Sequence, residues 1–488
     1  MKVPLRLAGR LMAVPADWEP VLRGVCSYDH AMTEQVNGRT EYFSERKQLY
    51  SVVGNEFVTF RGLRFRIEQL VNEKGHDLEV VEDCEPYRDP SVFMPDADAV
   101  DGVSWRYRQF DSFLLPSLHD DGIIDAVTAY GKTFITGKIC QGYPRARILV
   151  IVPGVALSGE MHKELTNLLG KGKVGHYATG SRNRHTRRVT VATPESMSHV
   201  NERHPDIILY DEVHTAASEG RGDRLLAFNH AKMFGFTGTA DGRSDNAELR
   251  IEAIFGPKRI NVPYQTARQH GLVAEVHYKQ VPVYSGKKAR DCYRDTDKMR
   301  YPIWQNKERN HVLALEAARF AADNPGEQVL VATCRTEHAL YLQQAFQELG
   351  WNIPVICGAI SADREESLRE HKALTDDSWV ITDRVGVRNY RDAFIHKREL
   401  YAIATSTFST GADFRHLRCL IYASGDTAKI AQKQWTGRAM RLGGQCADEA
   451  RSLVIDTSDE FCDSAKRRSQ ARRLVAEQSG WSLESSRG

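Results

Sequence analysis

Long hydrophobic runs, paired cysteines and an excess of charge of one sign are all missing from this 488-residue sequence. No apolar run approaches the roughly 20 residues that a bilayer-spanning helix requires. The N-terminal apolar stretch is interrupted by Arg6, Arg10 and Pro15, which argues against a signal peptide. We therefore expect a protein of the cytoplasm.

The nine cysteines are scattered from Cys26 to Cys462, and no two of them form a C-x-x-C pair. This spacing, with an odd total, argues against a zinc site or a disulfide framework and favours reduced thiols. The 66 basic residues nearly balance the 64 acidic ones, which leaves a net charge of +2. Bulk charge therefore gives no indication of a nucleic-acid binder, and any basic track must be local.

The composition is 41% hydrophobic and 27% charged, as in a soluble globular protein, and the length suits two or three domains. In the first hundred residues, short runs rich in Val, Phe and Tyr are punctuated by Gly54 and Gly62, which predicts a small α+β domain. An acidic stretch with three prolines, residues 83–101, indicates a linker.

From about residue 104, short apolar or β-branched runs alternate with helical stretches in two successive series. The runs lack period-two alternation, which is typical of parallel strands covered on both faces. The predicted fold class is therefore α/β, with two tandem parallel-sheet domains and a small N-terminal α+β domain. The predicted boundaries are 1–100 for the N-terminal domain, 101–283 for the first α/β domain, 284–310 for an interdomain linker, 311–460 for the second α/β domain and 461–488 for a basic tail.

Residues 126–133, Ala-Val-Thr-Ala-Tyr-Gly-Lys-Thr, follow one of these runs and open a helical stretch near Lys132. A phosphate-binding loop needs that context, because backbone N–H groups and a helix N-terminus then point at one anion. Lys132 would reach the β- and γ-phosphates of ATP, and Thr133 would hold Mg²⁺. Ala126 replaces the usual first glycine and Ala129 a second, so the loop departs from the usual pattern.

Asp211 and Glu212 end the apolar run 207–210 in the same predicted domain. Two adjacent acids at a buried strand end are costly unless a cation is present. We expect Asp211 to bind Mg²⁺ through water and Glu212 to polarise the attacking water. The alternative is a helix N-cap after a strand, and the phosphate loop upstream argues against it.

The tetrapeptide Asp211-Glu212-Val213-His214 resembles motif II, as a DEVH box, of the superfamily 2 helicases, and the other motifs follow in the family's order. Segments 255–258 and 269–273 are similar to runs in the phage UvsW-like, XPB-like and RecG-like branch-migration helicases. The resemblance implies two RecA-like domains with ATP and Mg²⁺ bound between them. In the first domain it implies nucleotide binding by Arg106, Gln109, Ala129, Tyr130 and Gly131, with Gln109 in contact with the base. It also implies that His214, Thr237 and Thr239 couple hydrolysis to nucleic-acid binding. Pro153 and Thr193 would contact the nucleic-acid backbone.

In the second domain, residues 434–441, Gln-Trp-Thr-Gly-Arg-Ala-Met-Arg, are similar to motif VI, and residues 404–413 to motif V. ATP bound to the first domain carries charge that an arginine of the second can stabilise in the transition state. Arg438 and Arg441 are therefore expected to be catalytic arginine fingers, beside Lys132 and Glu212. The resemblance further implies ATP contacts from Gly411 and Asp413, coupling through Gln434 and a nucleic-acid contact from Thr410.

The resemblance covers about residues 104–458 and implies a nucleic-acid-dependent ATPase. We expect a DNA helicase or translocase that unwinds or remodels forks and four-way junctions in recombination, repair or replication, in the host cytoplasm if a phage encodes it. The expected partners are branched or duplex DNA and recombination or replication proteins, with no membrane. The N-terminal domain would dock DNA, with a regulatory lid as the alternative.

Other functions stay open at this point. They are an RNA helicase, a motor subunit that translocates on duplex DNA without unwinding it, and a non-catalytic nucleic-acid-binding scaffold. Intact Lys132, Glu212, Arg438 and Arg441 argue against the scaffold.

Two basic clusters are ambiguous. In the run before residue 189 a solvated loop is favoured over contact with nucleic acid, and near the C-terminus phosphate contact and a solvated helix face are about equally supported. The first cluster is Arg182, Arg184, His185, Arg187 and Arg188, and the second is Lys466, Arg467, Arg468, Arg472 and Arg473.

Overall fold

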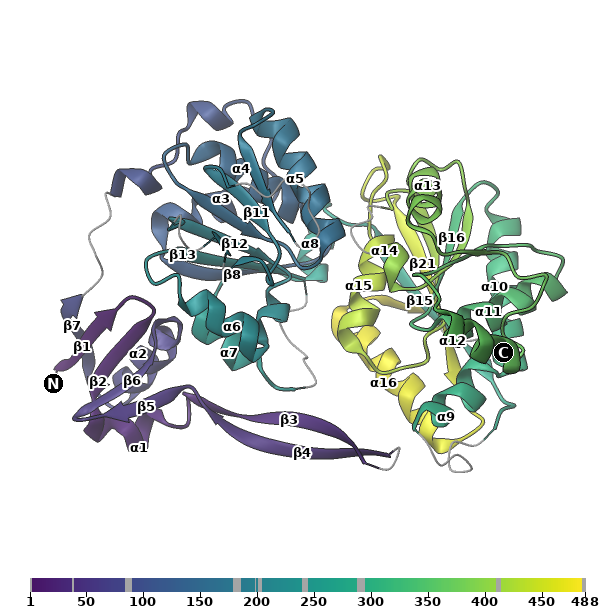
Figure 1. Ribbon diagram of the computed structural model, residues 1–488, viewed down its shortest axis with the longest axis horizontal. Helices are drawn as coiled ribbons and strands as arrows, with labels where there is room; N and C mark the ends of the chain where they lie inside the picture. Colours follow the sequence, from purple (N-terminus) through teal and green to yellow (C-terminus); the bar gives the residue numbers. More distant parts are fainter. Residues whose placement is uncertain are drawn as a thin grey trace. The chain divides into compact units, whose positions relative to one another are not determined.

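The computed structural model describes residues 2–36, 39–83, 90–178, 186–197, 199–200, 204–238, 245–287, 295–409 and 414–484 (Figure 1). The chain divides into two compact units. The first comprises Met1–Thr33 and Tyr42–Pro263, and the second Glu34–Glu41 and Tyr264–Gly488. Among the described residues, no helix has the length and apolar character to cross a bilayer.

The N-terminal part of the first unit contains a five-stranded sheet in the order β5-β6-β2-β1-β7, which confirms the predicted small α+β domain. Strand β1 alternates strictly, with Val3, Leu5 and Leu7 buried, so one face of the sheet packs on helix α2 and the other meets solvent. The elements are β1 (Lys2–Ala8), β2 (Leu11–Pro15), η1 (Ala16–Trp18), α1 (Glu19–Leu22), β5 (Tyr50–Val53), β6 (Glu56–Phe60), η2 (Arg61–Leu63), α2 (Arg64–Glu73), β7 (Asp77–Asp83) and a separate ribbon of β3 (Ser27–Val36) and β4 (Arg39–Gln48).

The N-terminal domain packs directly on helix α7 (Glu248–Phe255) of the larger domain that follows it. A Cβ on Gly62 would lie 2.5 Å from the carbonyl oxygen of Ala253, so the two backbones are in contact. Arg66 donates from Nε and Nη2 to both carboxylate oxygens of Glu252, each at 2.7 Å. A close backbone approach and a bidentate ion pair thus hold the two domains in one unit.

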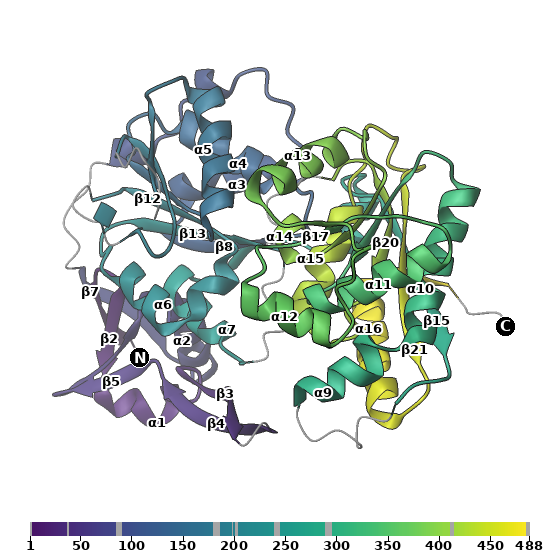
Figure 2. The ribbon, with the colours of Figure 1, turned by 45° about the vertical axis from the view of Figure 1, so that its right-hand side comes forward.

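The rest of the first unit is built on a seven-stranded parallel sheet in the order β10-β11-β9-β12-β13-β8-β14. Strands β9 and β11 are buried along their whole length. Helices α4 and α5 lie on one face of the sheet and α6 and α7 on the other (Figures 1 and 2), which explains the continuous apolar runs.

The strands of this sheet are β8 (Asp121–Ala126), β9 (Ile148–Ile151), β10 (Val174–Tyr177), β11 (Val189–Ala192), β12 (Ile207–Asp211), β13 (Lys232–Thr237) and β14 (Lys258–Val262). The other helical segments are η3 (Pro90–Phe93), η4 (Asp98–Val100), α3 (Gln109–Leu118), α4 (Lys132–Gly142), α5 (Val155–Leu169), η6 (Val213–Ala217) and α6 (Glu219–Leu226).

The second unit contains an eight-stranded parallel sheet in the order β18-β17-β19-β16-β20-β21-β15-β22, so both α/β domains have the predicted architecture. Helices α10 and α11 cover one face, and α15 and α16 lie on the other (Figures 1 and 2). The strands are β15 (Glu275–Val283), β16 (Gln328–Ala332), β17 (Val355–Ile356), β18 (Val380–Ile381), β19 (Tyr401–Ala404), β20 (Leu417–Tyr422), β21 (Arg451–Asp459) and β22 (Ser482–Glu484).

The helices of this unit are α8 (Tyr264–Gln269), α9 (Asp295–Met299), the π-helix η8 (Arg300–Trp304), α10 (Lys307–Asp323), α11 (Thr336–Glu348), α12 (Ala362–Glu370), α13 (Arg384–Ile395), α14 (Ser406–Ser409), α15 (Lys429–Ala439) and α16 (Asp463–Ser479). Strand β15 joins this sheet although it precedes the predicted boundary at residue 283. Segment 461–488, expected to be a tail, contains α16 and β22, and β22 pairs with β15.

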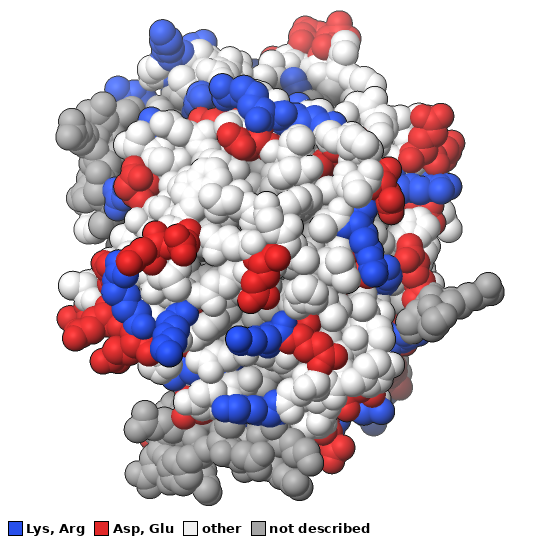
Figure 3. Space-filling model, turned by 90° about the vertical axis from the view of Figure 1, so that its right-hand side faces the viewer, with Lys and Arg blue, Asp and Glu red and all other residues white. Residues whose placement is uncertain are grey.

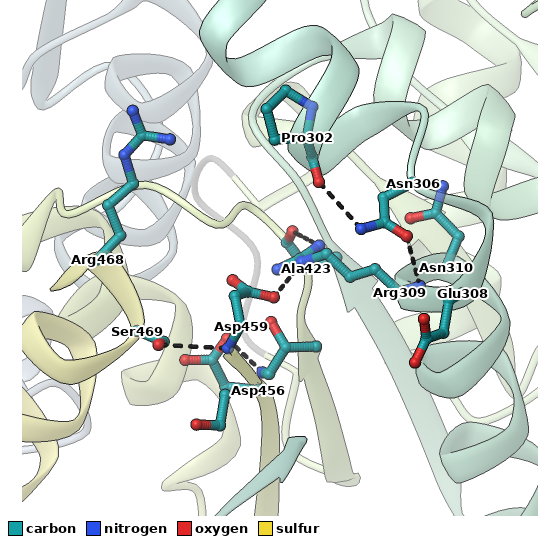
Figure 4. Close-up of polar contacts among 12 residues, drawn as sticks. Pro302, Asn306, Glu308, Arg309, Asn310, Ala423, Asp456, Asp459, Arg468 and Ser469 are labelled. Atoms are coloured by element: carbon teal, nitrogen blue, oxygen red, sulfur yellow. Dashed lines mark hydrogen bonds and ion pairs between the residues drawn. The ribbon is translucent and has the colours of Figure 1, made fainter. Parts of the chain in front are cut away.

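A buried ion-pair network crosses the second unit, and Figure 4 shows the part of it around Arg309 and Asp459. Arg309 on α10 donates from Nε to Asp459 Oδ1 at 3.1 Å and from Nη1 to the carbonyl oxygen of Ala423 at 2.8 Å. Arg472 on α16 donates from Nε to Asp456 Oδ2 at 2.7 Å and lies 3.3 Å from Asp459 Oδ2. Helices α10 and α16 are therefore both fixed to β21, and the guanidinium of Arg472 belongs to the interior.

Candidate functional site

Three strands of the seven-stranded sheet end side by side at its carboxyl edge and carry the predicted nucleotide residues. Neighbouring strands β8, β13 and β12 are in register, with Asp125 opposite Thr237 and Asp211 opposite Phe236. The phosphate loop, the acid pair and the Thr237 segment therefore leave the sheet at adjacent positions. In parallel sheets this edge is where ligands bind.

The loop between β8 and α4 has two residues in left-handed conformations, Ala129 with φ 80° and Gly131 with φ 96°. Ala129 occupies one of the positions where the sequence departs from the glycine pattern, and an alanine there costs about 1–2 kcal/mol relative to the right-handed region. Helix α4 begins at Lys132, so its first N–H groups and the side chain of Thr133 lie where an anion would bind.

Buried Gln109 and the guanidinium of Arg106 hold this loop. Gln109 Nε2 donates to the carbonyl oxygen of Tyr130 at 2.6 Å, and its Oε1 accepts from the Arg106 N–H at 3.0 Å. Arg106 Nη2 donates to the carbonyl oxygens of Ala129 at 3.1 Å and Tyr130 at 2.9 Å. A Cβ on Gly131 would lie 2.8 Å from Gln109 Nε2. The structure thus gives Gln109 a loop-bracing role, and its contact with the base stays a prediction.

Burial shifts the pKa of the groups that pack under the loop. It raises the pKa of Tyr130 to about 12, although a hydrogen bond with Ser112 acts in the opposite direction. It also lowers the pKa of Arg106, although a guanidinium stays protonated in proteins. Both groups therefore keep a constant charge at neutral pH.

The acid pair lies at the end of β12, and His214 connects it to the end of β13. Glu212 has φ 51°, and its N–H donates to Asp211 Oδ1 at 3.0 Å. His214 Nδ1 lies 3.3 Å from Glu212 Oε2 and 3.5 Å from Thr237 Oγ1. One imidazole thus contacts both the carboxylate expected to activate water and the first residue of the Thr237 segment. A strained, non-glycine backbone at such a position is typical of functional sites.

Lys132 completes this cluster. A Cβ added to Gly238 would lie 3.5 Å from the Nζ of Lys132, so the ammonium group is at the carboxyl end of β13. The structure thus brings Lys132, Glu212, His214 and Thr237 to one edge. Thr239 lies outside the described residues.

The residues expected to contact nucleic acid follow other strands of the same edge. Pro153 follows β9 and Thr193 follows β11, on the side of β12 away from the phosphate loop. Thr193 is 1% exposed, and its hydroxyl donates to Ser196 Oγ at 3.1 Å. Its side chain is therefore committed to the loop itself. Thr410, Gly411 and Asp413 of the second unit lie outside the described residues.

In the second unit, Gln434 and Arg438 lie on α15, and Arg441 lies two residues beyond its end. Trp435 and Thr436 anchor the helix in the core. Both arginines contact other residues. Their approach to bound ATP stays a prediction.

Sequence reasoning missed an aromatic cluster beside the phosphate loop. Trp105 packs against Phe110, Phe113 and Phe134, with ring centroids 5.3–5.7 Å apart. Phe110 and Phe134 are 45% and 38% exposed, so part of this cluster is accessible to solvent. The sequence features that could have predicted this cluster are the spacing of Phe110 and Phe113 and the position of Phe134 next to Thr133.

The basic run before β11 is partly structural. Arg188 donates to the carbonyl oxygens of Cys140 at 2.8 Å and of Tyr143 and Ala146 at 3.0 Å, so it caps the C-terminus of α4. Arg187 Nε donates to the carbonyl oxygen of Gly172. Arg188 therefore has a structural role, whereas Arg187 is exposed, as the favoured solvated loop predicts, and residues 182–185 lie outside the described ranges. Figure 3 shows basic and acidic side chains interspersed on the face that it presents.

The tandem parallel sheets, with a phosphate loop and an acid pair at one carboxyl edge, define a nucleotide-binding protein with two RecA-like domains. A family model described as "Type III restriction enzyme, res subunit" matches residues 96–242. The DNA 3'-5' helicase XPB of Mycobacterium tuberculosis is 25% identical over 288 residues, and that of Kineococcus radiotolerans is 24% identical over 437 residues. These matches cover 54% and 85% of this chain, and 49% and 70% of the relatives.

Two solved structures extend the comparison. A fragment described as an HsdR subunit of a type I restriction enzyme from Vibrio vulnificus has a TM-score of 0.54 at 15% identity, over 96% of this chain and 81% of its own. UvsW of T4 has a TM-score of 0.44 at 14% identity, over 99% of each chain.

The matched family model and the two XPB relatives support a superfamily 2 helicase or translocase, a class of ATP-dependent enzymes. This confirms the class expected from the motifs. The chain spans about half the length of the M. tuberculosis relative. The finer likeness to UvsW-like branch-migration helicases stays a prediction.

Proposed function

We propose that the protein is an ATP-driven DNA motor that unwinds or remodels branched DNA, such as forks and four-way junctions, in recombination, repair or replication. The observation that supports this most strongly is the contact of His214 with both Glu212 and Thr237. It links the carboxylate proposed to activate water to a segment whose movement would report the nucleotide state.

The proposed ATP site uses the carboxyl edge of the first sheet. The N–H groups of the loop and Lys132 would bind the phosphates. Thr133 and Asp211 are the hydroxyl and carboxylate donors that Mg²⁺ prefers, and Glu212 would orient water. Gly411 and Asp413 would add nucleotide contacts, Gln434 would couple hydrolysis to movement, and Arg438 and Arg441 would stabilise the charge that develops in the transition state.

DNA is proposed over RNA because both XPB relatives are named DNA 3'-5' helicases, and one of them aligns with most of this chain. On the same ground we propose 3'-to-5' movement. Residues near Pro153, Thr193 and Thr410 would contact the sugar-phosphate backbone of the DNA, so the protein would follow one strand without reading its sequence.

A second candidate is translocation on duplex DNA without strand separation, as the motor subunit of a larger complex. It is favoured by the family model described as a restriction-enzyme subunit and by the fold shared with the HsdR fragment. The two candidates differ in whether a duplex is opened.

ATP turnover measured with no polymer, single-stranded DNA, duplex DNA, a four-way junction and RNA tests the proposal. We expect DNA to stimulate turnover and a junction or fork to stimulate it most. Strand separation of a labelled fork supports the first candidate. Displacement of a third strand from a triplex without fork opening supports the second, and stimulation by RNA alone contradicts both.

A further inference from the structure

The backbone segment that contains Arg441 accepts hydrogen bonds at four consecutive carbonyl groups. The first of them belongs to Ala439, the last residue of α15, whose carbonyl oxygen has no partner within the helix. The other three follow the helix, and donors from three other segments bind all four. Ser452 Oγ donates to the carbonyl oxygen of Ala439, the Ala274 N–H to Met440 at 2.9 Å, Arg418 Nη1 to Arg441 at 3.0 Å and Arg418 Nη2 to Leu442 at 2.9 Å.

Arg418 supplies two of these four donors from a buried position on β20. Arg418 is 7% exposed, and burial lowers the pKa of its guanidinium. Its hydrogen bonds within the described part of the chain go to main-chain carbonyl oxygens, the third being that of Leu417 at 3.2 Å. A cation that is buried without a hydrogen-bonded carboxylate is costly. The charge-assisted bonds to the Arg441 and Leu442 carbonyls offset that cost and fix their positions.

The next residue tightens the same turn. Gly443 has φ 61°, and a Cβ there would lie 2.7 Å from Arg418 Nη2 and would also press on the carbonyl oxygen of Arg415. A side chain at this position would push the guanidinium away from the turn. The sequence therefore combines a buried arginine with a glycine that lets the backbone approach it.

We propose that Arg418 is a positioning residue, which sets the path of the main chain at Arg441 and so the direction of its side chain. This inference rests on the proposed function, in which Arg441 stabilises charge during ATP hydrolysis. Such a group must be held in its productive geometry, because a misplacement of about 1 Å costs on the order of a hundredfold in rate. Arg418 would not touch the nucleotide and would act only through Arg441.

The surroundings of Arg418 allow this to be tested in a folded protein. The guanidinium borders a cavity of about 380 Å³ that is also lined by Glu327, Glu449 and Arg451. Water can enter such a polar cavity and satisfy the carbonyl groups that an arginine-to-methionine change would leave. Arg451 is a control, because it lines the same cavity, pairs with Glu275 at 3.7 Å and, within the described residues, donates no hydrogen bond to the turn.

The test compares DNA-stimulated turnover and ATP binding in Arg418→Met, Arg418→Lys, Arg451→Met and Arg441→Ala proteins of matched thermal stability. We expect Arg418→Met to lower kcat about 10- to 100-fold, with KM for ATP changed less than about threefold, since ground-state binding would be intact. The kcat of Arg418→Lys should lie between those of Arg418→Met and the wild type, because one ammonium group cannot bind both carbonyl groups. Arg451→Met should keep wild-type turnover.

The Arg418→Met, Arg441→Ala double variant separates positioning from a general weakening of the fold. If Arg418 acts through Arg441, the second change adds no further loss of kcat, whereas independent effects multiply. Multiplied losses, or wild-type kcat in Arg418→Met beside an impaired Arg441→Ala, overturn the positioning role and leave the proposed function standing. A fully active Arg441→Ala protein overturns both the positioning role of Arg418 and the catalytic role proposed for Arg441, whereas turnover that DNA does not stimulate in the wild type overturns the proposed function itself.

Discussion

Replacing Arg472 with methionine should destabilise the second unit severely. The guanidinium lies 2.7 Å from Asp456 and 3.3 Å from Asp459, and both carboxylates are fully buried. Methionine keeps much of the side-chain volume but removes the charge. Asp456 then loses its ion-pair partner in the interior, while Asp459 keeps Arg309 at 3.1 Å.

The size of the effect follows from that burial. Removing one partner of a buried ion pair costs about 3–5 kcal/mol, because an uncompensated charge is left behind. In a domain of this size each 1 kcal/mol lowers Tm by about 2–4 °C. We therefore expect the second unit to unfold about 6–20 °C lower.

Differential scanning calorimetry at neutral pH measures this change, with Arg473→Met as the control. Arg473 is the adjacent residue, and its ion pair with Glu477 is exposed on both sides, so its loss should cost less than about 1 kcal/mol. Equal Tm values for the two variants would refute the buried-network account. An Arg472→Met protein with unchanged Tm but weaker DNA binding would restore the alternative of phosphate contact.

Three further predictions concern both units. Gly131→Ala should raise KM for ATP about tenfold or more, because the residue has φ 96° and the added Cβ meets Gln109; an unchanged KM contradicts the loop geometry. His214→Ala should cut DNA-stimulated turnover about tenfold by removing the contact with Glu212, while basal turnover and ATP binding persist; equal losses of basal and stimulated turnover would instead indicate simple damage to the site. His338 is buried, and its folded-state pKa lies well below 6.5, so it contributes stability above about pH 6.5 that is lost as the pH falls through that value, by at most about 1.4 kcal/mol per pH unit. Melting curves between pH 7.5 and 5.5 should therefore be steeper in pH for the wild type than for His338→Leu, and parallel curves would show that this imidazole does not contribute.

The position of the candidate nucleotide residues at one sheet edge was predictable, because each of them directly follows a strand in the sequence. Gly131, Lys132 and Thr133 follow one strand directly, and Asp211 and Glu212 follow another. Strands of a parallel sheet end at the same edge, so two short segments were enough to predict one site. The structure added the contact of His214 Nδ1 with the Glu212 carboxylate and the positive φ at Ala129, neither of which a residue pattern encodes.

The structural role of individual arginines was not predictable, because it depends on contacts between distant parts of the chain. Arg188 and Arg472 both stand in basic clusters that suit phosphate as well as solvent. In the folded protein one caps a helix whose carbonyl lies 48 residues away, and the other pairs with buried carboxylates. Arg418 gave no signal at all, since its partners are backbone atoms of the Arg441 turn.

The domain boundary also escaped prediction. Strand β15 contributes to the second sheet by pairing with β21 and β22, which are far along the chain. A local reading of residues 275–283 therefore placed it with the preceding domain. Sheet membership is set by tertiary pairing rather than by the character of the strand.

We propose that DNA stimulates ATP hydrolysis at the sheet edge that carries Glu212. Steady-state turnover with and without duplex or junction DNA, in the wild type and in Glu212→Gln, tests it most directly. We predict that DNA stimulates the wild type, and that Glu212→Gln still binds ATP but does not hydrolyse it. Wild-type turnover that no nucleic acid stimulates, or full turnover by Glu212→Gln, would contradict the account.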